Sequence, residues 1–318
     1  MATKVGVVGL GSIGLRMLEA FVADERFSVS AVWDPSPKAR SAAAAAYPTL
    51  PIAQGADEFY STQDIDLVYI ACPPAAHREH ALRAMAGHKR ILCEKPLGVD
   101  LDESEDLVRR VEADGVPNAV NLLLASARAA TELTAAIEDG RLGHISWVDI
   151  HLHLPQWAAK RYAEAPWLMT RAEGGFVREV TTHYLFLCRR LFGDLDTESR
   201  NIDYPHDGVS SETFANVHLT AKNTRITLTG STLGAGPEMN HVTFWGENAA
   251  YRIRDLHRLD KFDGERWMPA AQHGARPELD TYFDQLENLH AWLTGQPHRL
   301  ADFREALETQ RLVEAILT

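Results

Sequence analysis

Three glycines close to the start of the chain have the spacing of a phosphate-binding turn. Gly9-Leu10-Gly11-Ser12-Ile13-Gly14 follows a short apolar run and opens a helical pattern. In such a turn the first glycine permits a tight bend, the second lets the backbone approach a pyrophosphate, and the third lets helix and strand pack closely. The phosphate would lie on the helix N-terminus, which favours anions. The motif predicts a dinucleotide site formed by Gly9, Gly11, Ser12, Ile13 and Gly14.

An aspartate follows where such a motif meets the ribose of its dinucleotide. Asp34 stands twenty residues after Gly14, at the end of the second predicted strand. Its carboxylate can accept hydrogen bonds from both ribose hydroxyls, and it repels a 2′-phosphate. Asp34 therefore favours NAD over NADP, although Lys38 and Arg40 lie close enough to keep NADP open. The plainer alternative is a glycine turn beside a surface aspartate.

Short apolar strands alternate with helical patterns over the first 118 residues, as a parallel sheet with crossover helices requires. The third predicted strand ends in Cys72-Pro73-Pro74. Carboxyl ends of strands border the ligand crevice of such sheets, so these residues are expected to line the nicotinamide approach. The predicted strands are 5–8, 27–33, 67–71 and 90–93, and the predicted helices are 13–23, 38–47, 77–86 and 101–113.

The alternation of strands with helices ends after Pro117. Alternating runs follow one another with short polar turns, which indicates an antiparallel sheet. Two final helices are expected at about 278–293 and 301–316. The other predicted strands are 119–124, 145–154, 214–219, 225–229, 241–245 and 251–253, and the other predicted helices are 130–139 and about 175–192.

Composition narrows the class of protein. Among 318 residues, 32 are Lys or Arg and 44 are Asp or Glu, and the formal charge of −12 argues against nucleic-acid or anionic-membrane partners. No stretch approaches the ~20 apolar residues of a membrane helix, and the first residues lack signal-peptide anatomy.

Cys72, Cys93 and Cys188 are expected to be buried thiols in a reducing compartment, the cytoplasm. No metal site is expected, because the fourteen histidines show no H-E-x-x-H motif or clustered Cys/His spacing. His151 and His153 point to one face of a strand, which the alternation of polar residues on a sheet surface explains as well.

A second motif connects the chain with a known family. Ile91-Leu92-Cys93-Glu94-Lys95-Pro96-Leu97, with the preceding 70–74 run and His77, resembles the Gfo/Idh/MocA oxidoreductases, the glucose-fructose oxidoreductase and inositol dehydrogenase family. Gly140-Arg141-Leu142-Gly143 is similar to the start of the family's second domain. Gly174-Gly175, followed by Glu179 and His183, resembles its substrate helix. The resemblance spans nearly the whole chain.

The resemblance implies both a fold and an activity. The fold class is α/β: a Rossmann domain over residues 1–118, then an α+β domain over 119–318 with an open, predominantly antiparallel sheet, the last helices being free to pack back on the first domain. Similar proteins oxidise or reduce sugars and cyclitols, and they form homodimers or homotetramers through the open sheet. We therefore expect an NAD-dependent oxidoreductase that transfers a hydride at a hydroxyl or keto carbon of a sugar, cyclitol or sugar derivative.

Hydride transfer at an alcohol carbon needs a group that accepts the hydroxyl proton. Lys95 is expected beside the reacting oxygen; the alternative is a lysine at the domain edge. Glu179 and His183 are spaced i, i+4 and so share a helix face, where the carboxylate would orient the imidazole or bind a sugar hydroxyl. Which of Lys95 and His183 is the general base stays open. His77 and Glu94 are expected next to the cofactor.

Several positions depart from the family pattern. Glu179 stands where the family commonly has aspartate, and Thr181-Thr182 replaces a frequent Gly-Ser pair. Phe186 occupies a place often held by aspartate, and Asn121-Leu122-Leu123 lacks the arginine of an Asn-x-Arg pattern, so only Asn121 remains as a substrate contact there. These departures weaken an assignment to inositol or glucose and leave the cofactor argument intact.

Three further residues precede the substrate helix. Trp157 and Trp167 could stack on the apolar face of a sugar, and Arg171 could bind a carboxylate; alternatively, the tryptophans belong to the core. Two other functions stay open: an NAD-using hydrolase or lyase with transient redox chemistry, and a non-catalytic NAD(P)-sensing regulator. The presence of Lys95, His183 and the glycine motif together argues against the regulator.

Overall fold

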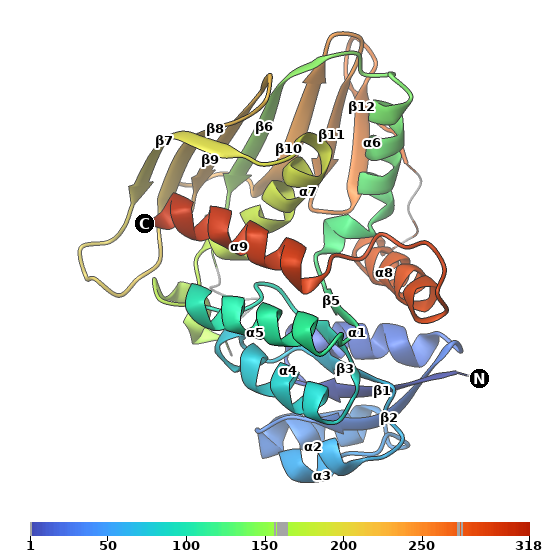
Figure 1. The fold of residues 1–318 in the computed structure, drawn as a ribbon. Helices are drawn as coiled ribbons and strands as arrows, with labels where there is room; N and C mark the ends of the chain where they lie inside the picture. The colour runs from blue at the N-terminus through green and yellow to red at the C-terminus, as the bar shows by residue number, and fades with distance from the viewer. Residues whose placement is uncertain (1, 156, 158–164, 272–273, 275) are drawn as a thin grey trace. The chain divides into compact units, whose positions relative to one another are not determined.

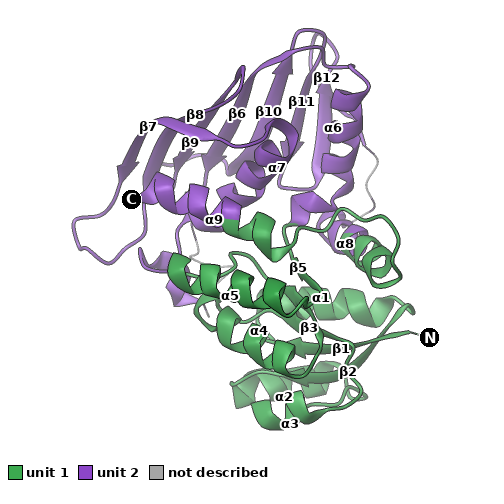
Figure 2. Ribbon diagram, in the orientation of Figure 1, with its two compact units in different colours: residues 1–122, 285–307 green, residues 123–284, 308–318 purple. Residues whose placement is uncertain are grey.

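The chain forms two compact units, and each is interrupted in sequence (Figure 2). The computed structural model describes residues 2–155, 157, 165–271, 274 and 276–318. The first unit comprises Met1–Leu122 and Gln285–Leu307, and the second comprises Leu123–Asp284 and Glu308–Thr318. Within the described residues, no helix combines the length and apolar character that a membrane span requires.

A five-stranded parallel sheet with the order β2-β1-β3-β4-β5 forms the first unit (Figure 1). An isolated parallel bridge between Val32 and Ile52 continues it beyond β2. The chain thus winds outward from β1 in both directions, and ligands of such sheets bind beyond the strand ends where the winding reverses. This arrangement confirms the predicted Rossmann fold. The strands are β1 (Thr3–Val8), β2 (Phe27–Trp33), β3 (Leu67–Ile70), β4 (Arg90–Cys93) and β5 (Asn118–Val120).

Local sequence explains where two of the helices in this unit begin. The side chain of Ser36 accepts a hydrogen bond from the Ala39 N–H at the start of α2, and Asp100 caps α5 in the same way. The short α3 was not predicted, because six residues are too few to display a helical period. The helices are α1 (Ser12–Ala23), α2 (Pro37–Ala46), α3 (Ala56–Ser61), α4 (His77–Ala86) and α5 (Leu101–Ala113).

The second unit is built on an eight-stranded sheet with the order β13-β12-β11-β10-β6-β9-β8-β7. Its neighbouring strands pair antiparallel except for β6 and β9, which run parallel, so the predicted predominantly antiparallel sheet is confirmed. The strands are β6 (Ile145–His153), β7 (Asp196–Asp203), β8 (Phe214–Ala221), β9 (Thr224–Ser231), β10 (Met239–Gly246), β11 (Ala250–Arg254), β12 (Arg258–Phe262) and β13 (Trp267–Pro269).

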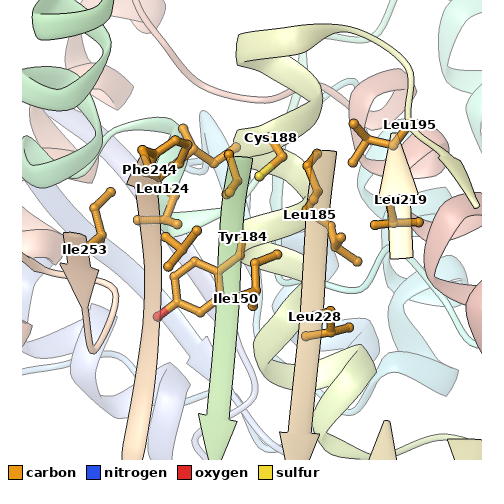
Figure 3. Close-up of a cluster of buried hydrophobic side chains, with 14 of the residues drawn as sticks. Leu124, Ile150, Tyr184, Leu185, Cys188, Leu195, Leu219, Leu228, Phe244 and Ile253 are labelled. Carbon is orange, nitrogen blue, oxygen red and sulfur yellow. The ribbon is translucent and has the colours of Figure 1, made fainter. Parts of the chain in front are cut away.

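Helices cover one face of this sheet. Strand β6 alternates between buried Val148, Ile150 and Leu152 and less buried residues on the opposite face. The buried side chains pack against α7 (Thr182–Phe192), with Tyr184 and Leu185 within the same core cluster (Figure 3). The remaining helices are α6 (Arg128–Glu138), α8 (Pro277–Leu293) and α9 (Phe303–Leu317), of which α8 and α9 are each divided between the two units.

The bounds of one predicted strand need correction, and strands β7, β12 and β13 were not predicted. The strand predicted at 119–124 is only Asn118–Val120, and residues Leu123–Ala125 form a 3₁₀ turn instead. Strand β7 was not predicted because its sequence is polar and its residues are mostly exposed, so no apolar alternation marks it. Strand β12 lies outside the runs that we identified, since its two buried residues, Leu259 and Asp260, are adjacent rather than alternating.

Candidate functional site

The three glycines of the turn differ in whether the fold could accept a side chain. Gly9 and Gly14 have no room for a Cβ, whereas Gly11 has room. Gly9 has a φ of +96°, and a Cβ there would overlap the backbone of Ala71. A Cβ on Gly14 would overlap the carbonyl oxygen of Gly9. At Gly11, however, φ is −72° and an added Cβ would meet nothing within 4 Å. The space beside Gly11 is therefore open, which leaves room for a pyrophosphate to approach the backbone.

The start of α1 has the features of an anion site. Gly11 is its N-cap and supplies no side-chain hydrogen bond, and the first turn contains no acidic residue. Gly11 and Ser12 are exposed, and Ile13 is half-buried. The first N–H groups of a helix have no partner within the helix, and they favour a negative charge. The residues present therefore fit the phosphates of a dinucleotide.

The carboxylate of Asp34 holds the glycine turn through hydrogen bonds to two backbone N–H groups. Its Oδ2 accepts a hydrogen bond from the Leu10 N–H at 2.8 Å, and its Oδ1 accepts one from the Ser36 N–H at 2.7 Å. Arg40 donates to the carbonyl oxygens of Asp34 at 2.7 Å and Pro35 at 3.2 Å. The sequence did not predict this structural role. A carboxylate has about four acceptor sites, so two remain for ribose hydroxyls.

The ends of β3 and β4 are joined by His77. Its Nε2 lies 2.9 Å from the carbonyl oxygen of Cys72, and its Nδ1 lies 2.9 Å from that of Pro96. The ring is fully buried, and this burial lowers the pKa of His77 to about 4. The imidazole is therefore neutral at pH 7 and has one N–H, so it donates to one of these two carbonyl oxygens and packs between the Cys72 turn and the Lys95–Pro96 peptide, which is cis.

The neighbouring side chains on this edge differ in exposure. Lys95 and Cys72 are half-buried, Pro73 is exposed and Pro74 is buried. All three cysteines are free, and burial raises the pKa of the Cys72 thiol to about 12. Cys72 is therefore protonated at pH 7 and lacks the thiolate that a nucleophile needs.

Glu94 and Asn121 belong to one buried cluster. The Oε1 of Glu94 accepts hydrogen bonds from the hydroxyl of Tyr69 and from Nδ2 of Asn121, both at 2.5 Å. Burial raises the pKa of the Glu94 carboxyl, while these donors oppose the rise. The Oδ1 of Asn121 is buried and has no hydrogen-bond partner among the described residues. The cluster connects residues on or next to β3, β4 and β5, and Glu94 directly precedes Lys95.

The helix with Glu179 and His183 begins differently from our prediction. We expected one α-helix from Gly175 to Phe192, but Val177–Thr181 forms a π-helix and α7 starts only at Thr182. Glu179 lies on the π-helix and is half-buried, whereas His183 lies on α7 and is 3% exposed. Short π-helical segments occur frequently at functional sites. Lys95 belongs to the first unit, and Glu179 and His183 belong to the second.

A buried carboxylate that the sequence analysis missed fixes the start of this segment. Glu212 is 1% exposed, and its Oε1 accepts a hydrogen bond from the Val177 N–H at 2.8 Å. Gly175 has a φ of +102°, and a Cβ there would overlap the Glu212 carboxylate, which explains the glycine. Burial raises the pKa of Glu212 to about 7. This contact could not be predicted from a local motif, because Glu212 lies more than thirty residues after Val177 in the sequence.

Arg178 connects the same turn with α9. Its Nε and Nη2 donate to the two carboxylate oxygens of Glu314 at 2.6 and 2.8 Å. Its Nη1 donates to the carbonyl oxygens of Arg171 and Gly174. A bidentate pair of this kind is directional, so it holds the turn in one position. This pair was also not predicted, because no local motif connects Arg178 with Glu314.

Trp157, Trp167 and Arg171, which precede the helix with Glu179 and His183, have different surroundings. Trp157 packs against the hydrophobic core, and its Nε1 donates to the Leu168 carbonyl oxygen at 3.3 Å, in line with the alternative of a core residue. Trp167 is half-buried on a 3₁₀ turn. The exposed guanidinium of Arg171 lies 3.9 Å from the centre of the Tyr204 ring.

The face of the second sheet opposite the helices carries a cluster with metal-ligand geometry. One ligand atom each from Asp149, His151 and His241 lies within 4.8 Å of the others. Burial lowers the pKa of His241 to about 4, so its imidazole is neutral at pH 7. We expected no metal site from the sequence, because His241 comes from a strand ninety residues away from His151 and no local motif connects them.

Family models match both halves of the chain. The model for the oxidoreductase family with an NAD-binding Rossmann fold matches residues 3–122, and the model for the GFO/IDH/MocA C-terminal domain matches residues 130–252. The first match includes the glycine turn, Asp34 and Lys95, and the second includes Glu179 and His183. Together the two models cover more than half of the chain.

Several characterised proteins are similar in sequence. A 1,5-anhydro-D-fructose reductase from Ensifer adhaerens is 29% identical over 46% of this chain and 44% of its own length. A dTDP-3,4-didehydro-2,6-dideoxy-alpha-D-glucose 3-reductase from Streptomyces violaceoruber is 28% identical over 65% and 59%. An inositol 2-dehydrogenase from Rhizobium meliloti is 27% identical over 61% and 56%. The chain thus matches about half of the length of these relatives.

Solved structures share the fold over nearly the whole chain. A dehydrogenase from Bordetella pertussis in complex with NADH and UDP-GlcNAcA has a TM-score of 0.79 and 20% identity, covering 99% of this chain and 94% of its own. A 3-ketoreductase from Actinomadura kijaniata with NADP and TDP-benzene has a TM-score of 0.82 and 18% identity, covering 99% and 97%. With both domain models matched and this fold, the chain belongs to the Gfo/Idh/MocA family of oxidoreductases.

Proposed function

We propose that the protein is an NAD-dependent oxidoreductase that transfers a hydride between nicotinamide and a hydroxyl or keto carbon of a sugar, cyclitol or sugar derivative. The observation that carries the proposal is the glycine turn at the start of α1, where Gly11 has open space beside it and no side chain caps the helix. Similar proteins that act on anhydrofructose, a dTDP-sugar and inositol support the substrate class.

Different residues would bind the cofactor and the substrate. The glycine turn and α1 would hold the pyrophosphate, and Asp34 would accept the ribose hydroxyls. Bound nicotinamide would supply or accept the hydride. Lys95 would donate a hydrogen bond to the reacting oxygen, and His183 would exchange its proton, with Glu179 fixing the imidazole or a substrate hydroxyl. His77 and Glu94 would lie next to the cofactor and help to position Lys95, and Asn121 would contact substrate.

Two further proposals concern the state of the protein. An aromatic surface on the uncovered sheet face, formed by Trp147, Trp245, Trp267 and Phe262, supports a homodimer or homotetramer that packs through this face. The three free cysteines suit a reducing compartment, so we propose the cytoplasm as its location.

A substrate screen tests the activity. Sugars, cyclitols and sugar acids are incubated with NAD or with NADP, and the absorbance of the reduced cofactor is followed. We expect turnover with NAD to exceed turnover with NADP because of the Asp34 carboxylate. A clear preference for NADP would contradict this role of Asp34, and product formation without net NADH would indicate the hydrolase or lyase alternative.

Substitutions of Lys95 and His183 test the roles of these residues. We expect Lys95→Ala and His183→Ala to lower kcat by about 10²- to 10⁴-fold, as loss of a proton-transfer group does. The dissociation constant for NAD, measured by calorimetry, should change far less. Equal losses in turnover and in NAD affinity would show instead that these side chains maintain the cofactor site.

A further inference from the structure

Two neighbouring strands bring three potential ligands to one face of the second sheet. Asp149 and His151 are two residues apart on β6, so both point to the same face. His241 on β10 is directly paired with His151 in the antiparallel register. The two imidazole rings lie 5.5 Å apart between centroids, and the three ligand atoms lie within 4.8 Å of one another. The sheet itself therefore fixes the spacing.

A hydrogen-bonded chain orients the carboxylate. The indole Nε1 of Trp147 donates to the Thr227 hydroxyl at 3.0 Å, and that hydroxyl donates to Oδ1 of Asp149 at 3.1 Å. Thr227 lies opposite Asp149 on β9. Metal-binding carboxylates commonly have such outer hydrogen bonds, which hold one oxygen and leave the other for the ion.

Neighbouring residues define the limits of the cluster. His153 lies on the same face of β6, but its ring nitrogens are 2.8 Å from the Pro237 carbonyl oxygen and 3.1 Å from that of Leu233. It is therefore engaged with a loop rather than with the cluster. Arg252 is a nearby cation that acts electrostatically on both His241 and Asp149. Its guanidinium carbon lies 4.1 Å from the centre of the Trp267 ring, and its Nε donates to Thr243.

We propose that Asp149, His151 and His241 form a binding site for a divalent transition-metal ion, with zinc as the ion that these ligands suit best. Two imidazole nitrogens and one carboxylate oxygen match the three protein ligands of zinc sites that keep a position for water. Magnesium and calcium prefer oxygen-only ligand sets, so the two histidines select against them. The ligands include none of the residues assigned to cofactor or substrate.

Calorimetry on the full chain without an affinity tag tests the site, with zinc chloride as the titrant and neither NAD nor substrate present. We expect one high-affinity zinc ion per chain, and at least a tenfold weaker affinity in His241→Asn. Thr227→Val should weaken binding by about tenfold, as loss of an outer hydrogen bond does. Arg252→Met should strengthen it because a repelling charge is removed. His153→Asn is the matched control and should leave the affinity unchanged.

The visible spectrum of bound cobalt gives a second readout, since its bands report the ligands of the ion. We expect these bands in the parent and in His153→Asn but not in His241→Asn. If His241→Asn fails to fold, as judged by near-UV circular dichroism, His151→Asn replaces it. Zinc binding that survives both substitutions, or that is lost equally in His153→Asn, would overturn the proposal. The result is independent of the proposed oxidoreductase activity.

Discussion

Gly11 and Gly14 are three residues apart in one turn, yet they serve different purposes. At Gly14 the hydrogen side chain is needed by the protein itself, because a Cβ would overlap the Gly9 carbonyl oxygen. At Gly11 the backbone conformation is ordinary and the adjoining space is open. The consequence of losing each glycine should therefore appear in a different measurement.

We expect Gly11→Ala to weaken NAD binding at least tenfold while lowering the free energy of unfolding by no more than about 1 kcal/mol, the scale of an N-cap change. Gly14→Ala should lower it by about 2 kcal/mol or more through overpacking. Calorimetry with NAD and urea unfolding measure the two effects. A Gly11→Ala variant that binds NAD as tightly as the parent would exclude a pyrophosphate at this turn.

The segment with Glu179 and His183 shows how contacts distant in sequence decide a local element. Its start is held by Glu212 on one side and by the Arg178–Glu314 pair on the other. The pKa of Glu212 is raised from its ordinary value of 4.5 to about 7 by burial. A carboxyl whose pKa is higher in the folded state loses its contribution to stability as the pH rises from 4.5 through 7.

We therefore expect the parent to lose up to ~3 kcal/mol of unfolding free energy between pH 5 and pH 8 through Glu212. Glu212→Gln, which stays neutral, should match the parent at pH 5 and exceed it at pH 8. His77, whose pKa is lowered to about 4, acts in the opposite direction at acid pH and is common to both proteins. Urea unfolding at the two pH values measures the difference, and parallel pH profiles would exclude ionisation of Glu212 as the cause.

Sequence reasoning succeeded where the signal is local and failed where it is not. The strand, glycine turn and helix of the first unit follow from adjacent residues, so the Rossmann fold was predictable. The π-helix was not predictable, because the sequence of residues 177–181 continues an α-helical pattern. Its contacts with Glu212 and Glu314 involve residues that are distant in sequence. The metal-ligand cluster was missed for the same reason, since pairing of β6 with β10 is a property of the sheet.

At the scale of the whole molecule, the sheet face opposite the helices is the surface that we expect to pack against a second copy of the chain. Phe262 is 37% exposed and contacts Trp267, which in turn contacts Trp245. Exposed aromatic surface of this kind favours burial against a partner. We expect the parent to sediment as a dimer or tetramer and Phe262→Glu to shift it towards the monomer. Met268→Glu, exposed by 39% in the adjacent strand, is the control and should have no effect.

The place of β6 in the middle of its sheet has a consequence for biosynthesis. Its two neighbours, β9 and β10, begin only at Thr224 and Met239, so a ribosome must add some seventy further residues before either edge of β6 can be paired. At about 5–20 residues per second, that interval lasts several seconds. A strand with one apolar face and two unpaired edges is prone to aggregate during this interval. Chains that terminate shortly after Ala221 should therefore precipitate in cells, even though the five strands of the first sheet and helices α1 to α5 have already been synthesised by then.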